Sequence, residues 1–335
     1  MTFEGAEQSI ITTIHGLYDD REAATIAAMV MEFVTGKSKM DRWLQKNELL
    51  SKEDLKSLEK YSKELLTGKP VQYVLGEAWF AGLCLQVNEH TLIPRPETEE
   101  LVNLCANWAA ANMMQHASLK ILEVGTGSGC IAIALQKKLP NAQITAVDFS
   151  TEAVKVASAN AIANNTAITF ITLDFLDETT WLGLGSYDII ISNPPYIADM
   201  EKENMAKHVL DFEPHTALFV PDNNALLFYN AIANFGNNHL SNAGALFVEI
   251  NQALGKQTQE VFVQNNYNTL LKKDLDVEEC IYKKDLDPDS DLDPNSYLYP
   301  ELIYKIIGNL DTDMKNVIYE FINKHYINIY SSVNL

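Results

Sequence analysis

The sequence predicts an α/β protein in which a small helical domain precedes a mostly parallel sheet with helices on both faces. Strand-like apolar segments alternate with helical segments from residue 119 onwards. Such alternation is typical of parallel strands joined by crossover helices. Residues 1–68 show helical spacing instead, as at Ile10, Ile14 and Leu17. The chain has 335 residues, a length that suits about two domains.

The helical domain is expected to span residues 1–70. The segment AATIAAMVMEFV is a strong helix former. Ser51 is placed to cap a later helix, which Gly68 and Pro70 end. The apolar stripe of that helix consists of Leu55, Leu58, Tyr61 and Leu65. No constellation of chemically active side chains stands out in this domain.

A β-hairpin linker is predicted over residues 71–95. Aromatic and β-branched residues prevail from Val71 to Val87, and Gly76 and Gly82 mark turns. The prolines of LIPRPETEELV (92–102) then stiffen an extended segment, and its acidic residues suit the start of a helix.

Residues 96–280 are expected to form the α/β domain. Its predicted strands are LKILEVG (119–125), AQITAVD (142–148), AITFITLD (167–174), YDIIISN (187–193) and GALFVEI (244–250). Its predicted helices include GCIAIALQKKL (129–139), STEAVKVASANAIANN (150–165) and NALLFYNAIANFGNNHL (224–240).

Charge and composition predict a cytoplasmic protein with no direct nucleic-acid contact. The formal net charge of −20 opposes attraction to phosphate backbones. The N-terminus lacks the pattern of a signal peptide, and no apolar run approaches the roughly 20 residues of a membrane span, so no membrane association is expected. The four cysteines lack the spacing of metal ligands, so we predict reduced, buried thiols and no metal site.

The C-terminal stretch, residues 281–335, is predicted to be an acidic linker followed by an extension without an assigned role. DLDPDSDLDP (285–294) resembles a calcium loop in its alternating Asp residues, but it lacks the glycine and glutamate that such a loop requires. A solvated linker is the better interpretation. LIYKIIGNL and NVIYEFINKHYINIY, which follow it, have helical or strand-like patterns.

A glycine loop follows the first predicted strand of the α/β domain and indicates a nucleotide-like ligand. Glycines at such a turn allow positive φ and bring bare backbone close to a ligand. Asp148 ends the next strand about 20 residues later, where a carboxylate accepts hydrogen bonds from ribose hydroxyls. The loop consists of Gly125, Thr126, Gly127, Ser128 and Gly129.

The loop spacing is G-x-G-x-G, whereas dinucleotide sites prefer G-x-G-x-x-G. It therefore favours S-adenosylmethionine, which carries a ribose and no phosphate. Asp174 and Phe175, at the end of the third strand, suit the amino group and the face of an adenine ring. Taken singly, a Phe in this place is more often part of the core.

The strand YDIIISN ends on Asn193-Pro194-Pro195-Tyr196, at the sheet edge where ligands bind. Neither proline has an N–H, so the Pro194 carbonyl is held outside the ladder. An amide or aromatic NH₂ is a poor nucleophile because its lone pair is delocalised. The Asn193 side-chain oxygen and the Pro194 carbonyl can hold its two hydrogens and turn the nitrogen towards an electrophilic methyl group, while Tyr196 covers the planar group.

The chain resembles the release factor glutamine methyltransferases, the PrmC/HemK family, from near its N-terminus to about residue 274. The matching segments are PVQYVLGEAWFAG (70–82), LIPRPETEELV (92–102), ILEVGTGSGCIAIAL (121–135), NPPYI (193–197), FEPHTAL (212–218) and GALFVEINQ (244–252). NPPY alone also occurs in enzymes that methylate bases, but its combination with LIPRPETE is far more specific.

The resemblance implies a class I (Rossmann-like) methyltransferase sheet and an N-terminal helical domain that docks a release factor. It implies methyl transfer from S-adenosylmethionine to the side-chain amide nitrogen (N5) of the glutamine in a Gly-Gly-Gln loop. Residues 125–129 would hold the methionine part, Asp148 the ribose, Phe175 the adenine and residues 193–196 the substrate glutamine. LIPRPETE would line the same cleft.

Three features depart from the family pattern. Phe175 stands where Trp is frequent, PDNNALLFY (221–229) replaces a glycine-rich stretch, and the residues after KKDL (272–275) match nothing in the family.

Three alternatives remain open from the sequence. An amino-methyltransferase of a nucleic-acid base (adenine N6, guanine N2 or cytosine N4) shares the NPPY chemistry, but the net charge and LIPRPETE argue against it. An NAD-type oxidoreductase is disfavoured by the glycine spacing. A non-enzymatic binding module is disfavoured by the intact glycines, Asp148 and Asn193.

Overall fold

The computed structural model describes residues 1–113, 118–273 and 278–283. Apart from residues 281–283, the predicted acidic linker and C-terminal extension lie outside the described residues, and so does part of KKDL.

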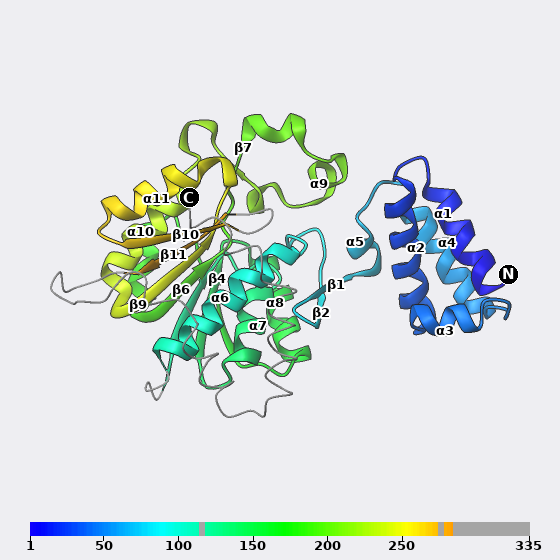
Figure 1. The fold of residues 1–335 in the computed structure, drawn as a ribbon, viewed down its shortest axis with the longest axis horizontal. Helices are drawn as coiled ribbons and strands as arrows, with labels where there is room; N and C mark the ends of the chain where they lie inside the picture. The colour runs from blue at the N-terminus through cyan, green and yellow to red at the C-terminus, as the bar shows by residue number, and fades with distance from the viewer. Residues whose placement is uncertain (114–117, 274–277, 284–335) are drawn as a thin grey trace, which may run out of the picture. The chain divides into compact units, whose positions relative to one another are not determined.

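The N-terminal region is helical, as the spacing of its apolar residues predicts. Its first helices are α1 (Phe3–Ile14), α2 (Asp20–Thr35), α3 (Lys39–Leu44) and α4 (Lys52–Leu65) (Figure 1). Each begins after a residue whose side-chain oxygen accepts a hydrogen bond from a backbone N–H of the first turn. These capping residues are Thr2, Asp19, Ser38 and Ser51. Ile10, Ile14, Leu58 and Leu65 are buried in one core, whereas Leu17 lies beyond the end of α1 and is exposed.

The linker begins with a helix that the sequence analysis missed. Val71 and Val74, one helical turn apart, both pack into the core of the N-terminal helices. This packing outweighs the strand preference of β-branched residues. Gly76 ends the helix with a φ of 75°. The elements are α5 (Val71–Leu75) and an antiparallel hairpin of β1 (Glu77–Phe80) and β2 (Leu83–Gln86), so the hairpin starts later than predicted.

A seven-stranded sheet follows, with the order β10-β11-β9-β6-β3-β4-β5. β3, β4, β5, β6 and β9 are parallel, and β11 is antiparallel to both of its neighbours. The α/β fold predicted from the alternating segments is therefore confirmed. The strands are β3 (Lys120–Val124), β4 (Gln143–Asp148), β5 (Ile168–Thr172), β6 (Tyr187–Ser192), β9 (Leu240–Glu249), β10 (Asn268–Lys273) and β11 (Glu278–Lys283), the last of which runs past the predicted boundary at residue 280.

Helices cover both faces of this sheet (Figure 1). On β6, Ile189 and Ile191 enter the core beneath α6 and α7, while Ile190 enters the core beneath α10 and α11. Burial on both faces explains why β6 is continuously apolar. The helices are α6 (Pro96–Asn112), α7 (Cys130–Lys138), α8 (Thr151–Ala163), α10 (Leu227–His239) and α11 (Gly255–Gln264). Among the described helices, none has the length and apolar character required to cross a membrane.

Short elements connect β6 to α10 and cover the carboxyl ends of the parallel strands. β7 and β8 form a separate parallel pair there. These elements are β7 (Ile197–Ala198), α9 (Lys207–Phe212), β8 (Phe219–Val220) and the 3₁₀ turns Asp199–Asn204, His215–Ala217 and Asp222–Asn224; two further 3₁₀ turns are Glu178–Gly183 and Gln252–Leu254.

The prediction of buried thiols holds only in part. Cys105 on α6 is buried in the core, whereas Cys84 on β2 is exposed. Successive side chains of a strand point to opposite faces, so β2 buries Leu85 and exposes the preceding residue, Cys84.

Candidate active site

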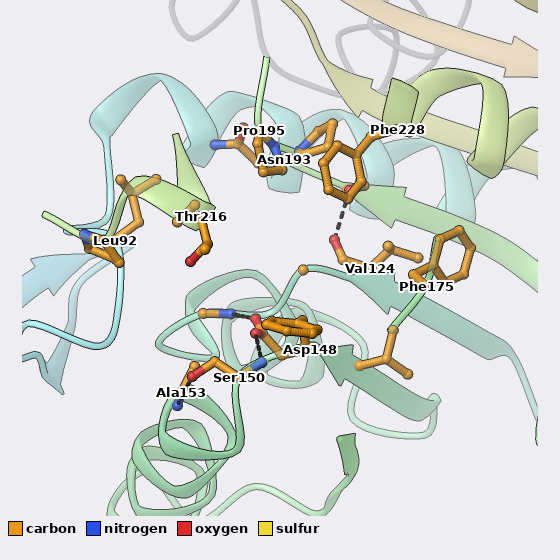
Figure 2. Close-up of a pocket in the computed structure, with 18 of the residues that line it drawn as sticks. Leu92, Val124, Asp148, Ser150, Ala153, Phe175, Asn193, Pro195, Thr216 and Phe228 are labelled. Atoms are coloured by element: carbon orange, nitrogen blue, oxygen red, sulfur yellow. Dashed lines mark hydrogen bonds between the residues drawn. The ribbon is translucent and has the colours of Figure 1, made fainter. Parts of the chain in front are cut away.

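A cavity of about 460 Å³ lies at the carboxyl ends of β3, β4, β5 and β6. Figure 2 shows Asn193 and Pro195 on one side of the open space and Asp148 and Ser150 on the opposite side. Loops at this edge of a parallel sheet converge, which is why residues far apart in the chain meet here. The predicted site residues that line the cavity are Gly125, Gly127, Asp148, Asp174, Phe175, Asn193, Pro194 and Pro195.

Four predicted site residues lie beside the cavity and do not line it: Thr126, Ser128, Gly129 and Tyr196. Within the loop, Thr126 and Ser128 are buried. Gly129 has a φ of 82°, and a Cβ there would lie 3.1 Å from the Cβ of Ala157. Gly129 therefore allows close packing of α7 against α8.

Asp148 anchors the glycine loop. Its two carboxylate oxygens accept backbone hydrogen bonds of 2.8 Å, one from Gly127 and one from Ser150. Burial raises the pKa of Asp148, and these two hydrogen bonds oppose that rise. Each carboxylate oxygen keeps a further lone pair for a ligand hydroxyl.

Four of the five N–H groups of the glycine loop donate hydrogen bonds within the protein. Gly125 and Thr126 both donate to the carbonyl of Val147, Gly127 donates to Asp148, and Gly129 donates to the carbonyl of Thr126. A pyrophosphate needs free N–H donors at such a loop. The loop therefore suits a ligand without phosphate better than a dinucleotide.

Two phenylalanines border the cavity in different ways. Phe175 is 5% exposed, and its ring packs against Trp181 and Phe235, so most of it belongs to the core. Phe149 directly follows Asp148, lines the cavity and is 65% exposed. Phe149 was not predicted as a site residue from the sequence, although its place next to the acid predicted to bind ribose was a usable signal.

Glu123, on β3 beneath the glycine loop, was also passed over. It is fully buried and accepts a hydrogen bond of 2.7 Å from the Thr126 hydroxyl. Its other carboxylate oxygen has no partner among the described residues. Burial raises the pKa of Glu123 to about 8. The folded protein therefore keeps a proton on Glu123 near neutral pH.

We expect Glu123→Gln to raise the free energy of unfolding relative to wild type, by an amount that grows with pH. The pKa of Glu123 lies near 8 in the folded state and near its ordinary 4.5 in the unfolded chain. Between these two pKa values the folded state binds a proton on Glu123 that the unfolded state has lost. The free energy of unfolding of wild type therefore falls as pH rises, and this fall levels off above the folded-state pKa. Gln does not titrate. Urea unfolding at about pH 6 and about pH 9 measures the difference; an equal gain at both pH values would contradict it.

Asn193 is held by a buried hydrogen-bonded chain. Its Nδ2 lies 3.1 Å from the Thr98 hydroxyl, which donates to Glu249 Oε2 at 2.7 Å. The Tyr196 hydroxyl donates to Glu249 Oε1 at 3.3 Å. Thr98 and Glu249 are each 2% exposed. Thr98 of the LIPRPETE segment and Glu249 at the end of β9 thus form a hydrogen bond next to Asn193 of the NPPY segment.

The two acceptors predicted at the end of β6 have no protein donors within the described parts of the chain. Neither Asn193 Oδ1 nor the Pro194 carbonyl accepts a hydrogen bond there. The Tyr196 ring packs beside the core and its hydroxyl is bound to Glu249. The Tyr196 side chain therefore packs against the protein and does not line the cavity.

The LIPRPETE segment is also tied to FEPHTAL. Arg95 and Glu213 form an ion pair of 2.6 Å, and the other oxygen of Glu213 accepts a hydrogen bond from the Ile93 N–H at 3.2 Å. Glu213 is buried, which strengthens the pair. Leu92 and Thr216, each three residues from a partner in this ion pair, both line the cavity (Figure 2).

Comparison with known proteins identifies similar chains. Residues 104–217 match the family model "Methyltransferase small domain", and residues 16–76 match "PrmC N-terminal domain". A release factor glutamine methyltransferase of Flavobacterium psychrophilum is 43% identical over 279 residues, which cover 82% of this chain and 96% of that protein. The protein of the same name from Bacteroides thetaiotaomicron is 37% identical and covers 82% and 94%. A third, from Lactococcus lactis, is 41% identical and covers 70% and 84%.

Proposed function

Since this chain belongs to the family of release factor glutamine methyltransferases, we propose that it methylates the side-chain amide nitrogen (N5) of the glutamine in the Gly-Gly-Gln loop of a peptide chain release factor. The resemblance found in the sequence is thereby confirmed, and the sheet is that of a class I methyltransferase. We expect the reaction to take place in the cytoplasm, where release factors act.

One observation carries this proposal. Asn193 Oδ1 and the Pro194 carbonyl are two acceptors that receive no hydrogen bond from any described residue, and both residues line the same cavity as Asp148. A primary amide presents two N–H hydrogens in one plane. If the two acceptors hold these two hydrogens, one face of the amide plane at the nitrogen would be turned towards the cavity.

The cavity residues fit S-adenosylmethionine. Asp148 has lone pairs for the two ribose hydroxyls, Phe149 offers an exposed ring for the adenine, and four of the five N–H groups of the glycine loop are already hydrogen-bonded within the protein. When bound, this co-substrate supplies an electrophilic methyl group on a sulfonium. Asp148 and Phe149 would hold it beside the substrate amide. As the nitrogen–carbon bond forms, the sulfur–carbon bond of the sulfonium would break, S-adenosylhomocysteine would be left, and the amide nitrogen would lose one proton.

The proposal is tested by incubating the purified protein with methyl-labelled S-adenosylmethionine and a release factor, followed by mass mapping. We expect one added methyl group on the glutamine of the Gly-Gly-Gln loop and none on a release factor with that glutamine replaced. RNA and DNA are incubated in parallel with the protein and the labelled S-adenosylmethionine. Label in nucleic acid alone would replace this proposal by a base methyltransferase.

Phe149→Ala is expected to weaken S-adenosylmethionine binding by roughly tenfold, or ~1.4 kcal/mol, since an exposed aromatic wall is lost. Phe175→Ala serves as the contrast: it should lower the free energy of unfolding by about 3–5 kcal/mol because it opens a cavity in the core. Calorimetric titration and urea unfolding distinguish the two effects. Unchanged affinity in Phe149→Ala would remove this residue from the site.

A further inference from the structure

The Thr98 hydroxyl determines which end of the Asn193 amide faces the cavity. A hydroxyl has one hydrogen, and here it is donated to Glu249 Oε2 at 2.7 Å. The same oxygen can then only accept from Asn193, so the amide atom 3.1 Å away is the nitrogen, Nδ2. Oδ1 is consequently the end left for a ligand.

Glu249 sets the direction of this chain of hydrogen bonds. It ends β9, is 2% exposed, and its two oxygens accept from Thr98 and Tyr196. Burial raises the pKa of Glu249, while the hydrogen bonds from Thr98, Tyr196 and Asn193 oppose that rise. Because these side chains all donate to it, the Glu249 carboxyl group is the final acceptor in this series of hydrogen bonds.

We propose that Thr98 and Glu249 are positioning residues that lock the Asn193 amide with its oxygen towards the substrate. The proposal rests on the proposed function, because that oxygen must accept a hydrogen from the substrate amide. A reversed Asn193 would present an NH₂ group to the substrate NH₂ group, and the two donors would repel each other. Neither residue touches the substrate; each acts through Asn193.

The kinetic test compares Thr98→Val, Thr98→Ser and Glu249→Gln. Val has the shape of Thr without its hydroxyl, so we expect kcat to fall by roughly tenfold, as for one lost hydrogen bond, with S-adenosylmethionine affinity unchanged. Ser keeps the hydroxyl and should restore most of kcat. Gln at position 249 can donate to Thr98 and so permits the reversed amide; its kcat should fall as in Thr98→Val. Wild-type kcat in Thr98→Val would overturn the proposal.

Thr258→Val is the matched control. Thr258 is a fully buried threonine on α11, and its hydroxyl has no partner among the described residues. We expect this variant to keep the wild-type kcat. A loss equal to that of Thr98→Val would show that any buried Thr-to-Val change impairs the enzyme, which would contradict a specific role for Thr98.

A double-mutant cycle separates positioning from general support of the fold. If Thr98 acts through Asn193, then Asn193→Ala together with Thr98→Val should be no slower than Asn193→Ala alone. If the two losses multiply, Thr98 acts independently of Asn193 and the proposal fails.

An NMR measurement tests the orientation without any substrate. The side-chain NH₂ signals of Asn193, assigned by their disappearance in Asn193→Ala, should exchange slowly with solvent in wild type and faster in Thr98→Val. Fast exchange in wild type would contradict the proposal. This result is independent of the methylation assay: a wild type inactive on release factors would overturn the proposed function, whereas the NMR result decides the orientation in either case.

Discussion

Asn193→Ala is expected to lower kcat by about 10²-fold or more and to leave the affinity for S-adenosylmethionine nearly unchanged. The substitution removes one of the two acceptors proposed to orient the substrate amide, and losses of this size follow the removal of a single orienting group at a reaction centre. The Asn193 side chain makes its hydrogen bond to Thr98, and not to Asp148 or the glycine loop, so the contacts of Asp148 with that loop should be preserved.

Single-turnover kinetics with a release factor and calorimetric titration of the co-substrate measure the two effects separately. If the variant methylated at the wild-type rate, the role assigned to the Asn193 oxygen would be wrong. A parallel loss of co-substrate affinity would place Asn193 in cofactor binding instead of substrate orientation.

Asp148→Ala is expected to weaken S-adenosylmethionine binding by roughly 10- to 100-fold. The change removes the proposed acceptor for the ribose, and it also leaves the N–H groups of Gly127 and Ser150 without the carboxylate that they donate to. Asp148→Asn should weaken binding as well, because an amide has one acceptor oxygen where the two N–H groups need two.

Asp188→Ala is the matched control for Asp148. Asp188 also accepts two hydrogen bonds, from the Lys120 N–H and the Ser241 hydroxyl, but it lies at the amino end of β6. We expect it to lower stability while the affinity of the folded protein for the co-substrate stays the same. Equal losses of affinity in the two variants would indicate a general effect on the sheet, not a ribose contact.

The sheet could be predicted because its signals are local. Ile189, Ile190 and Ile191 form an uninterrupted apolar run, as expected of a strand buried on both faces, and the prolines that follow them mark its end. Positions at the carboxyl ends of parallel strands meet in any such sheet, so Asp148 and Asn193 could be assigned to one cavity before the structure was known.

Other features depend on tertiary contacts that one sequence does not encode visibly. Thr98 and Glu249 are far apart in the chain, and their pairing follows from the packing of α6 against β9. Whether Phe149 or Phe175 exposes its ring depends on which of the two packs into the core, and Phe175 packs there beside Trp181.

The helix α5 is a further example. VQYVL favours a strand by local propensity, but Val71 and Val74 fall on one helical face and bury against the N-terminal core. Local preference and tertiary packing disagree at this point, and packing determines the outcome.

A crystal structure of the protein with S-adenosylhomocysteine and a release factor would show how the substrate amide is oriented. We expect the glutamine amide nitrogen within about 3.2 Å of both Asn193 Oδ1 and the Pro194 carbonyl, a distance set by N–H···O geometry, with the sulfur on the open side of the amide plane. A glutamine bound elsewhere, or an Asn193 amide presenting its nitrogen to the substrate, would contradict it.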